Sequence, residues 1–175
     1  MRTTHAIAFQ RRHTSAALLC VLLSALGWPA SAATCNLSIC SLSFGSYVGT
    51  QVSSTSSATF SCSKTAPGNI PERVDYTVSL STGAGSYAQR MMTRTALPAD
   101  ILPYNLYLNL LPPVLNTSVW GDGTGTTVSW TGGFNLTSGN PIRVDTATLV
   151  GAIPAGSFPS AGSYQDTVVA TFVIL

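Results

Sequence analysis

Short runs in which apolar and polar residues alternate follow one another along the chain. The clearest run places apolar side chains at every second position, with more polar ones between them: Val74, Tyr76, Val78 and Leu80 alternate with Asp75, Thr77 and Ser79. A period of two is typical of a β-strand that buries one face. Similar runs predict further strands at 34–44, 57–62, 89–95, 101–108, 126–130, 142–153 and 164–175.

Glycine, serine, proline and asparagine separate these runs, and no segment has the periodicity of an amphipathic helix. The longest predicted loop covers residues 45–56, and Pro112-Pro113 and Gly139-Asn140-Pro141 mark two further breaks. Seven or eight strands with a break about every dozen residues are typical of an antiparallel β-sandwich of immunoglobulin-like type. Since no internal repeat or long linker divides the chain, we predict one all-β domain.

The first 32 residues have the pattern of an export signal. A basic start leads into an apolar run at 16–26, which is shorter than a membrane span, and Ala30-Ser31-Ala32 provides small residues at the expected cleavage position. We therefore expect a signal peptide at 1–32 and a mature domain at 33–175. No later apolar stretch reaches about 18 residues, so the mature chain is not expected to span a membrane.

Removal of the signal changes which chemistry is available. Both histidines leave with it, and the remaining five basic and six acidic side chains give a net charge of −1. The basic surface that nucleic acid would require is therefore absent. The whole chain is 45% hydrophobic and only 8% charged, which favours a folded core over disorder.

Three cysteines remain in the mature chain: Cys35, Cys40 and Cys62. In an oxidising compartment two of them are expected to form a disulfide, which leaves one thiol. Cys35 and Cys40 lie on opposite faces of a regular strand, so either a bulge lies between them or Cys40 is the partner of Cys62. Cys40 can also remain a buried free thiol. A metal site is the weaker interpretation, because no histidine completes the ligand set.

The last predicted strand is apolar on both faces. Val168, Ala170, Phe172 and Ile174 form one row, and the other row carries further apolar side chains. Such a strand belongs in the middle of a sheet, yet the chain stops at Leu175. We therefore expect its open edge to take a strand from another molecule.

Several segments together resemble the spore coat protein U family, whose members are exported subunits of archaic chaperone-usher pili and related surface coats. The matching segments, in order, are Cys35 nine residues before Phe44-Gly45, Ser61-Cys62, 76–80, Tyr104-Asn105-Leu106-Tyr107, Trp120-Gly121-Asp122-Gly123, Gly151-Ala152-Ile153-Pro154-Ala155-Gly156, and Ala161-Gly162-Ser163-Tyr164-Gln165-Asp166-Thr167. Each segment alone is weakly specific, but their order and spacing cover the mature chain.

The resemblance implies an immunoglobulin-like pilin domain that lacks its last strand. In this family a periplasmic chaperone holds such a subunit, an outer-membrane usher assembles it, and another pilus subunit donates the missing strand. The expected route is export through the inner membrane to the periplasm, and then to the cell surface or a fibre. The resemblance also implies the disulfide Cys35–Cys62 and a groove beside the row of Val168.

One departure from the family concerns the donor strand. Polymerising members carry an alternating extension before the first cysteine, whereas only Ala33 and Thr34 precede Cys35 after the predicted cleavage. The chain is therefore expected to be a terminal or minor subunit. The alternative is a spore or cell-surface coat protein of the same fold that does not polymerise through an usher.

Two other segments invite functional interpretations. The sequence Gly121-Asp122-Gly123-Thr124-Gly125 lacks the lysine of a phosphate loop and the several carboxylates of a calcium loop, so a tight turn is expected. Around Pro112-Pro113, the apolar residues Leu110, Leu111, Val114 and Leu115 form either a buried connection or an exposed loop that adheres to surfaces, as in cell adhesion or biofilm formation.

Enzymatic activity is not expected. The mature chain has no histidine to act as a base, its one lysine lies in a polar loop, and its six acids have no spacing that favours a carboxylate pair. We also expect no cofactor. A small surface lectin is a third possibility, although no sequence feature selects it.

Overall fold

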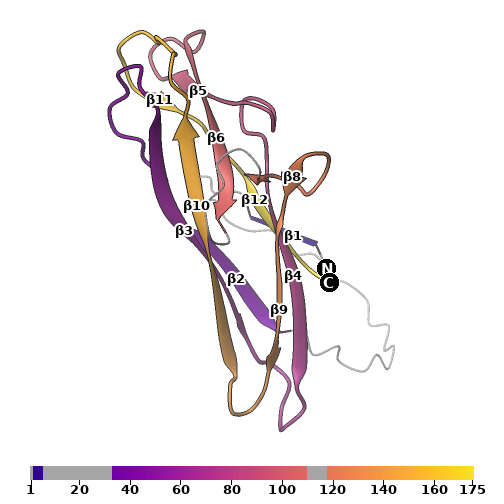
Figure 1. The fold of residues 1–175 in the computed structure, drawn as a ribbon. Helices are drawn as coiled ribbons and strands as arrows, with labels where there is room; N and C mark the ends of the chain where they lie inside the picture. Colours follow the sequence, from indigo (N-terminus) through magenta and orange to yellow (C-terminus); the bar gives the residue numbers. More distant parts are fainter. Residues whose placement is uncertain (1, 6–32, 110–117) are drawn as a thin grey trace, which may run out of the picture.

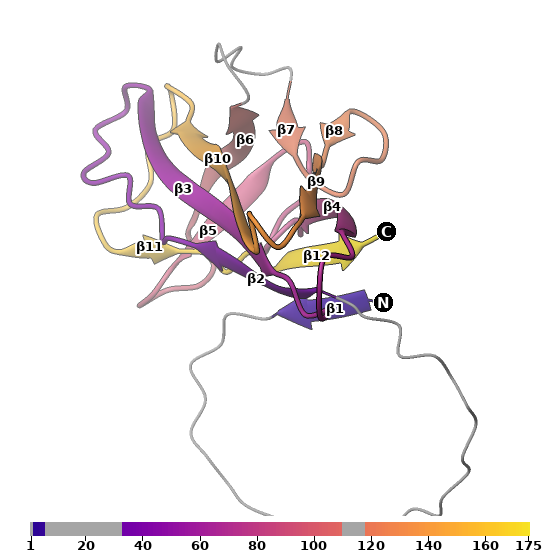
Figure 2. The same ribbon diagram turned by 90° about the horizontal axis from the view of Figure 1, so that it is seen from below.

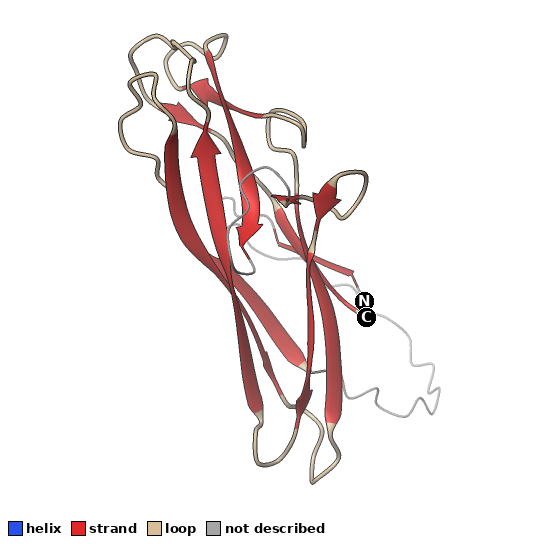
Figure 3. Ribbon diagram, viewed as in Figure 1, coloured by secondary structure: helices blue, strands red, loops and turns tan. Residues whose placement is uncertain are grey.

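The computed structural model of the chain describes residues 2–5, 33–109 and 118–175, and all regular elements in this part are strands (Figures 1 and 3). The strands are β1 (Arg2–His5), β2 (Thr34–Ile39), β3 (Val52–Ser63), β4 (Glu72–Leu80), β5 (Arg90–Arg94), β6 (Ile101–Asn109), β7 (Val119–Trp120), β8 (Thr127–Val128), β9 (Trp130–Leu136), β10 (Ile142–Ile153), β11 (Tyr164–Gln165) and β12 (Ala170–Ile174).

The strands form two sheets. One has the order β1-β12-β4-β9, and the other has the order β11-β5-β6-β10-β3-β2, with the short β7 and β8 attached to β6. Every ladder is antiparallel except the pairing of β7 with β8. The result is an immunoglobulin-like sandwich, which confirms the predicted fold class.

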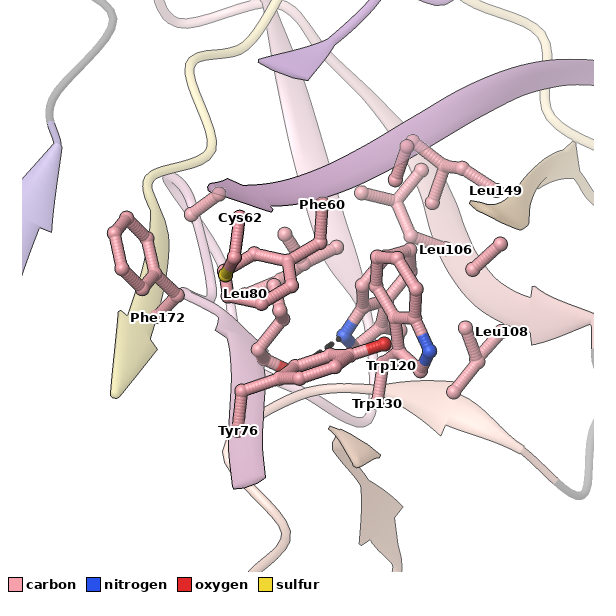
Figure 4. Close-up of a cluster of buried hydrophobic side chains, with 14 of the residues drawn as sticks. Phe60, Cys62, Tyr76, Leu80, Leu106, Leu108, Trp120, Trp130, Leu149 and Phe172 are labelled. Atoms are coloured by element: carbon pink, nitrogen blue, oxygen red, sulfur yellow. Dashed lines mark hydrogen bonds between the residues drawn. The ribbon is translucent and has the colours of Figure 1, made fainter. Parts of the chain in front are cut away.

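The core between the sheets is rich in aromatic side chains, as Figure 4 shows. Phe60 of β3 lies with its ring centroid 4.0 Å from that of Tyr76 and 5.4 Å from that of Phe172. Trp120 and Trp130 pack edge to face at 6.2 Å and are almost fully buried, as expected for packing residues. Each such ring contributes about 1.5–3 kcal/mol through burial. The alternation in β3 and β4 thus places one row of each strand in a shared core.

The cysteines lie on the two faces of the first mature strand. Cys35 of β2 forms a disulfide with Cys62 of β3, the pairing that the resemblance implies. Cys40 is free and exposed, so the interpretation of a buried thiol is wrong. The half-buried side chains in this region shift from odd positions, ending at Ile39, to even positions, beginning at Leu42. Cys40 directly follows β2, continues the alternation of that strand and is exposed, as the parity of the strand predicted.

Four predicted strands have different bounds in the structure. The strand predicted at 34–44 ends at Ile39. β3 begins at Val52, so the expected loop at 45–56 is shorter. The predicted strand at 126–130 is replaced by β8 and the seven-residue β9, which contains Gly132 and Gly133. A Cβ atom at Gly132 would lie 2.5 Å from the hydroxyl oxygen of Tyr76, so the close approach of β4 explains a glycine in the strand.

The predicted strand at 164–175 is also divided. β11 pairs with β5 in one sheet, whereas β12 pairs with β4 in the other. Asp166 anchors the crossing between them: its carboxylate accepts hydrogen bonds from the Tyr104 hydroxyl at 2.7 Å and from the Ala84 amide at 3.1 Å. A single polar side chain thus directs the chain from one sheet to the other.

Candidate functional site

The outer edge of β12 pairs with the short strand β1. β12 has β4 on one side and the four-residue β1 on the other, with Arg2 opposite Val173 and His5 opposite Ala170. β1 belongs to the segment that the predicted cleavage removes. Without it, β12 would be the edge strand of its sheet, and its outward N–H and C=O groups would have no ladder partner.

The predicted groove row lies on the inner face of this strand. Ala170 and Phe172 are buried, while Val168 and Ile174 are half-buried and pack against the core. On the opposite face the side chains are half-buried, and only Leu175 beyond the strand is strongly exposed. The apolar pattern of the sequence therefore corresponds to a strand that is buried on its inner face and half-buried on the other, with β1 at its outer edge.

Residues 40–48 lie across from the segment that leads into β12 and form the second wall of a groove. They follow β2 but belong to no strand. Leu42 and Phe44 point inward here, and the ring of Phe44 packs edge to face on that of Tyr104, with centroids 5.9 Å apart. Gly151 of β10 lies beneath them, since a Cβ atom there would approach Phe44 to 2.7 Å. The glycine at this position therefore lets the wall lie directly on the sheet.

A groove with a volume of about 840 Å³ separates the two walls. Its apolar lining includes Leu42, Phe44, Leu102, Tyr104, Val168 and Ala170. A smaller hollow of about 290 Å³ lies at the other end of β12, lined in part by Ala33, Val74 and Ile174. Figure 2 shows β1 beside β12 on the same side of the molecule as β2. Hollows large enough for apolar side chains thus lie at both ends of β12.

Polar contacts hold the segment before β12 in position. Besides the bonds from Tyr104 and Ala84, Asp166 accepts a hydrogen bond from the Thr167 amide at 2.7 Å. Burial, followed by the hydrogen bond to Asp166, raises the pKa of Tyr104. Tyr104 therefore stays a neutral donor over the physiological range and keeps this wall of the groove in place.

A buried arginine that the sequence analysis did not single out supports the neighbouring loops. Arg90 is fully buried and donates hydrogen bonds to the carbonyl oxygens of Ser81 and Trp120 and to the side-chain oxygen of Asn105, at 2.7–3.2 Å. Burial lowers the pKa of its guanidinium. Its place in the inward row of β5 beside buried Met92 was the signal available in the sequence.

The structure brings together only part of the predicted set of family residues. Phe44, Gly45, Tyr104, Gly162, Tyr164 and Asp166 line the groove with Val168 and Ala170. Asn105 and Trp120 meet at Arg90, away from this lining. The segment with Leu110, Leu111, Val114 and Leu115 lies outside the described residues.

The remaining motif glycines belong to turns and loop contacts. Gly123 and Gly125 have positive φ, and Asp122 accepts hydrogen bonds from the backbone and side chain of Thr124, as in the predicted tight turn. These bonds lower the pKa of Asp122. The Gly156 amide donates to the Gly49 carbonyl at 3.0 Å. The carbonyl of the neighbouring Pro154 accepts a bond from the Tyr47 hydroxyl. The turn and these loops are thus held by internal contacts.

Neither a membrane-spanning helix nor a metal-binding cluster is present in the part of the chain that the structure describes. The described residues contain no helix that has the length and apolar character needed to cross a membrane. They also contain no cluster of three or more His, Cys, Asp or Glu side chains that could hold a metal ion.

A family model described as Spore Coat Protein U domain matches residues 19–171, nearly the whole chain. No curated protein matches the chain.

Proposed function

The chain belongs to the Spore Coat Protein U domain family and is thus a surface subunit of pilus or coat type; we propose that it is completed by a strand from a partner. In this proposal the chain is exported to the periplasm, a chaperone covers the edge of β12, and an usher then exchanges the chaperone for a strand of another pilus subunit. The function is structural, and no enzymatic activity is proposed.

The observation that carries this proposal is the groove beside the edge of β12. The edge accepts a strand with an antiparallel register, and the groove continues past the end of that strand along Val168. A donor that filled it with three or four apolar side chains would contribute roughly 5–10 kcal/mol, at about 1.5–3 kcal/mol for each. This sum is comparable with the whole stability of a small domain. Strand donation is therefore sufficient to determine whether the subunit is stable.

The same geometry indicates which strand would fit. β1 reaches only from Val173 to Ala170, so an antiparallel donor that fills the groove must extend at least several residues further, beside Val168 and residues 40–48. Its inward positions face Leu42, Phe44 and Leu102, which favours apolar residues at every second position. Backbone hydrogen bonds would supply affinity, and the alternate side chains would supply specificity.

We further propose that this subunit receives a strand but donates none. After the predicted cleavage only Ala33 and Thr34 precede Cys35, whose disulfide fixes β2 to β3. Two residues cannot span the groove of a neighbour. A terminal or minor position in a fibre follows, and a coat of the same fold that assembles without an usher is the alternative.

The test uses the processed, oxidised protein purified from periplasm with whatever binds it. Peptides of about a dozen residues with alternating apolar positions are added, and the controls are the same peptides with serine at those positions. We expect the apolar peptides to release a bound chaperone and to raise the melting temperature, while the serine peptides do neither. A processed monomer that melts cooperatively alone and ignores every strand peptide would contradict strand acceptance. Fibres formed by this protein alone would contradict the terminal position.

A further inference from the structure

Exposed apolar side chains gather on loops at one end of the sandwich. Phe158 is 90% exposed and Val48 is 80% exposed, and Leu97 is 56% exposed. They belong to loops 154–163, 45–51 and 95–100, which lie together beyond β11 and the start of β6, at the top of Figure 1. These three side chains are called the tip patch below. Exposed apolar side chains grouped in this way are typical of an interaction surface.

The three loops are held in fixed relation to one another. The Tyr47 hydroxyl donates to the Pro154 carbonyl at 2.7 Å, and the Thr95 amide donates to the Ser163 carbonyl at 2.9 Å. Phe158 lies against Gly49, where a Cβ atom would approach its ring to 3.3 Å. The tip patch is therefore presented by a preformed surface, which reduces the entropic cost of binding.

The chemistry of the tip patch suits an uncharged partner surface. The three loops contain a single charged residue, Asp100, which forms an ion pair with Arg94 at 3.1 Å. A partner that covered these loops would thus not have to bury an unpaired charge. The uncharged surroundings favour a protein surface that is apolar at its centre.

The position of the tip patch relative to the groove identifies the occupant. The strand seen on β12 runs antiparallel, so its first residue lies at Val173 and its later residues lie toward Ala170. Continued in that direction, a donor passes Val168 and leaves the groove between Tyr47 and Pro159, two lining residues of the loops that carry Val48 and Phe158. The folded domain that follows the donated strand must therefore lie at this end of the molecule.

We propose that the tip patch is the docking surface for the body of the subunit that donates its strand. This inference rests on the proposed function and adds a second contact to it. The strand fills the groove, while the domain directly behind the strand covers Val48, Leu97 and Phe158. Two linked contacts bind more tightly than either alone, because the second forms at a high effective concentration.

Photo-cross-linking in the producing cells tests the arrangement. A photoreactive phenylalanine analogue is placed at Phe158 and, separately, at Ser41, an exposed residue of the groove wall. We expect both positions to cross-link to the same chain: Ser41 to its N-terminal strand, and Phe158 to the domain behind that strand. The control position is Ile142, which is 63% exposed at the start of β10, and no cross-link to that domain is expected there.

Binding of the identified donor supplies the quantitative measurement. The double substitution Val48→Ser with Phe158→Ser is expected to weaken binding of the intact donor at least tenfold and to leave binding of its isolated strand within twofold of the parent. Ile142→Ser is expected to change neither. Strand binding with no effect of the double substitution on the intact donor would overturn the docking surface alone, and a cross-link from Phe158 only to a different protein would do the same. Failure of the parent protein to bind any strand would overturn the proposed function, and this inference with it.

Discussion

Substitution of Gly151 by alanine is expected to narrow the groove without unfolding the domain. Gly151 lies in β10, and the added methyl carbon would approach Phe44 Cζ to 2.7 Å and Leu42 Cδ2 to 2.8 Å. Carbon atoms in contact prefer about 3.5–4.0 Å, so each side chain must retreat by about 1 Å. Both contacts involve the far ends of side chains on residues 40–48, which no ladder fixes. The open direction for their movement is the groove.

The substitution Gly151→Ala should therefore lower the affinity of the groove for a donor strand. Loss of the space for one donor side chain forfeits about 1.5–3 kcal/mol of burial. Since about 1.4 kcal/mol corresponds to a factor of ten, the dissociation constant of the donor peptide should rise by one to two powers of ten. The free domain should lose less than about 1 kcal/mol, because the groove has room for the displaced side chains.

The assay is a titration of labelled donor peptide followed by fluorescence anisotropy, together with urea unfolding of the free domain. Gly139→Ala is the matched control, since no atom lies within 4 Å of a Cβ placed there. The reasoning would be refuted by the opposite pattern, in which peptide affinity is unchanged and the domain is destabilised by about 1–3 kcal/mol. That pattern would mean that Phe44 and Leu42 press into the core and not into the groove.

Two further predictions concern stability. Arg90→Met should lower the free energy of unfolding in urea by about 3–5 kcal/mol, because three buried oxygen acceptors lose their charged donor, whereas the exposed Arg143→Met should change it little. Burial raises the pKa of Tyr76 and of Tyr104, and hydrogen bonds to Asp145 and Asp166, respectively, raise it further. As the pH passes about 10, these tyrosines therefore ionise only in the unfolded chain. In urea titrations these two tyrosines should cause no change in stability between neutral pH and about pH 9, and a fall of up to about 1.4 kcal/mol per pH unit per tyrosine above pH 10. A Tyr76→Phe protein should show a shallower alkaline slope, and an unchanged slope would contradict the assignment.

The strands that could be predicted from sequence are those in which one period-two row enters the core. β4 and β10 have this pattern, and the range 142–153 agrees with the structure. β9 could not be found in this way, because its Gly132 and Gly133 read as a break. The reason for both glycines lies in another strand: the side chains of Tyr76 and Asp75 occupy the space where their Cβ atoms would be. Local sequence cannot reveal a steric demand made by a partner that is distant along the chain.

The candidate site was predictable in part for the same reason. The row of Val168, Ala170, Phe172 and Ile174 was evident from its spacing. Val168 and Ala170 line the groove, whereas Phe172 is buried in the core and Ile174 lines the smaller hollow. The division of the last predicted strand was not evident, since it depends on hydrogen bonds that Asp166 accepts from Tyr104 and Ala84, both remote along the chain. The four hydrogen bonds that Arg90 donates likewise depend on acceptors in three separate segments of the chain. Hydrogen bonds between segments that are distant along the chain thus determine strand ends and loop positions that the apolar pattern does not specify.

The groove can stay open without an occupant because each wall is fixed by contacts within the domain. On one side, the Cys35–Cys62 disulfide and the β2–β3 ladder hold the start of the wall, and Phe44 packs on Tyr104 and Gly151. On the other side, the β4–β12 ladder and the Asp166 hydrogen bonds fix the edge strand. Tyr104 connects the two walls, since Phe44 packs on its ring and its hydroxyl donates to Asp166. A donor strand would therefore meet walls that are already ordered, and the conformational entropy lost on binding would be mainly its own.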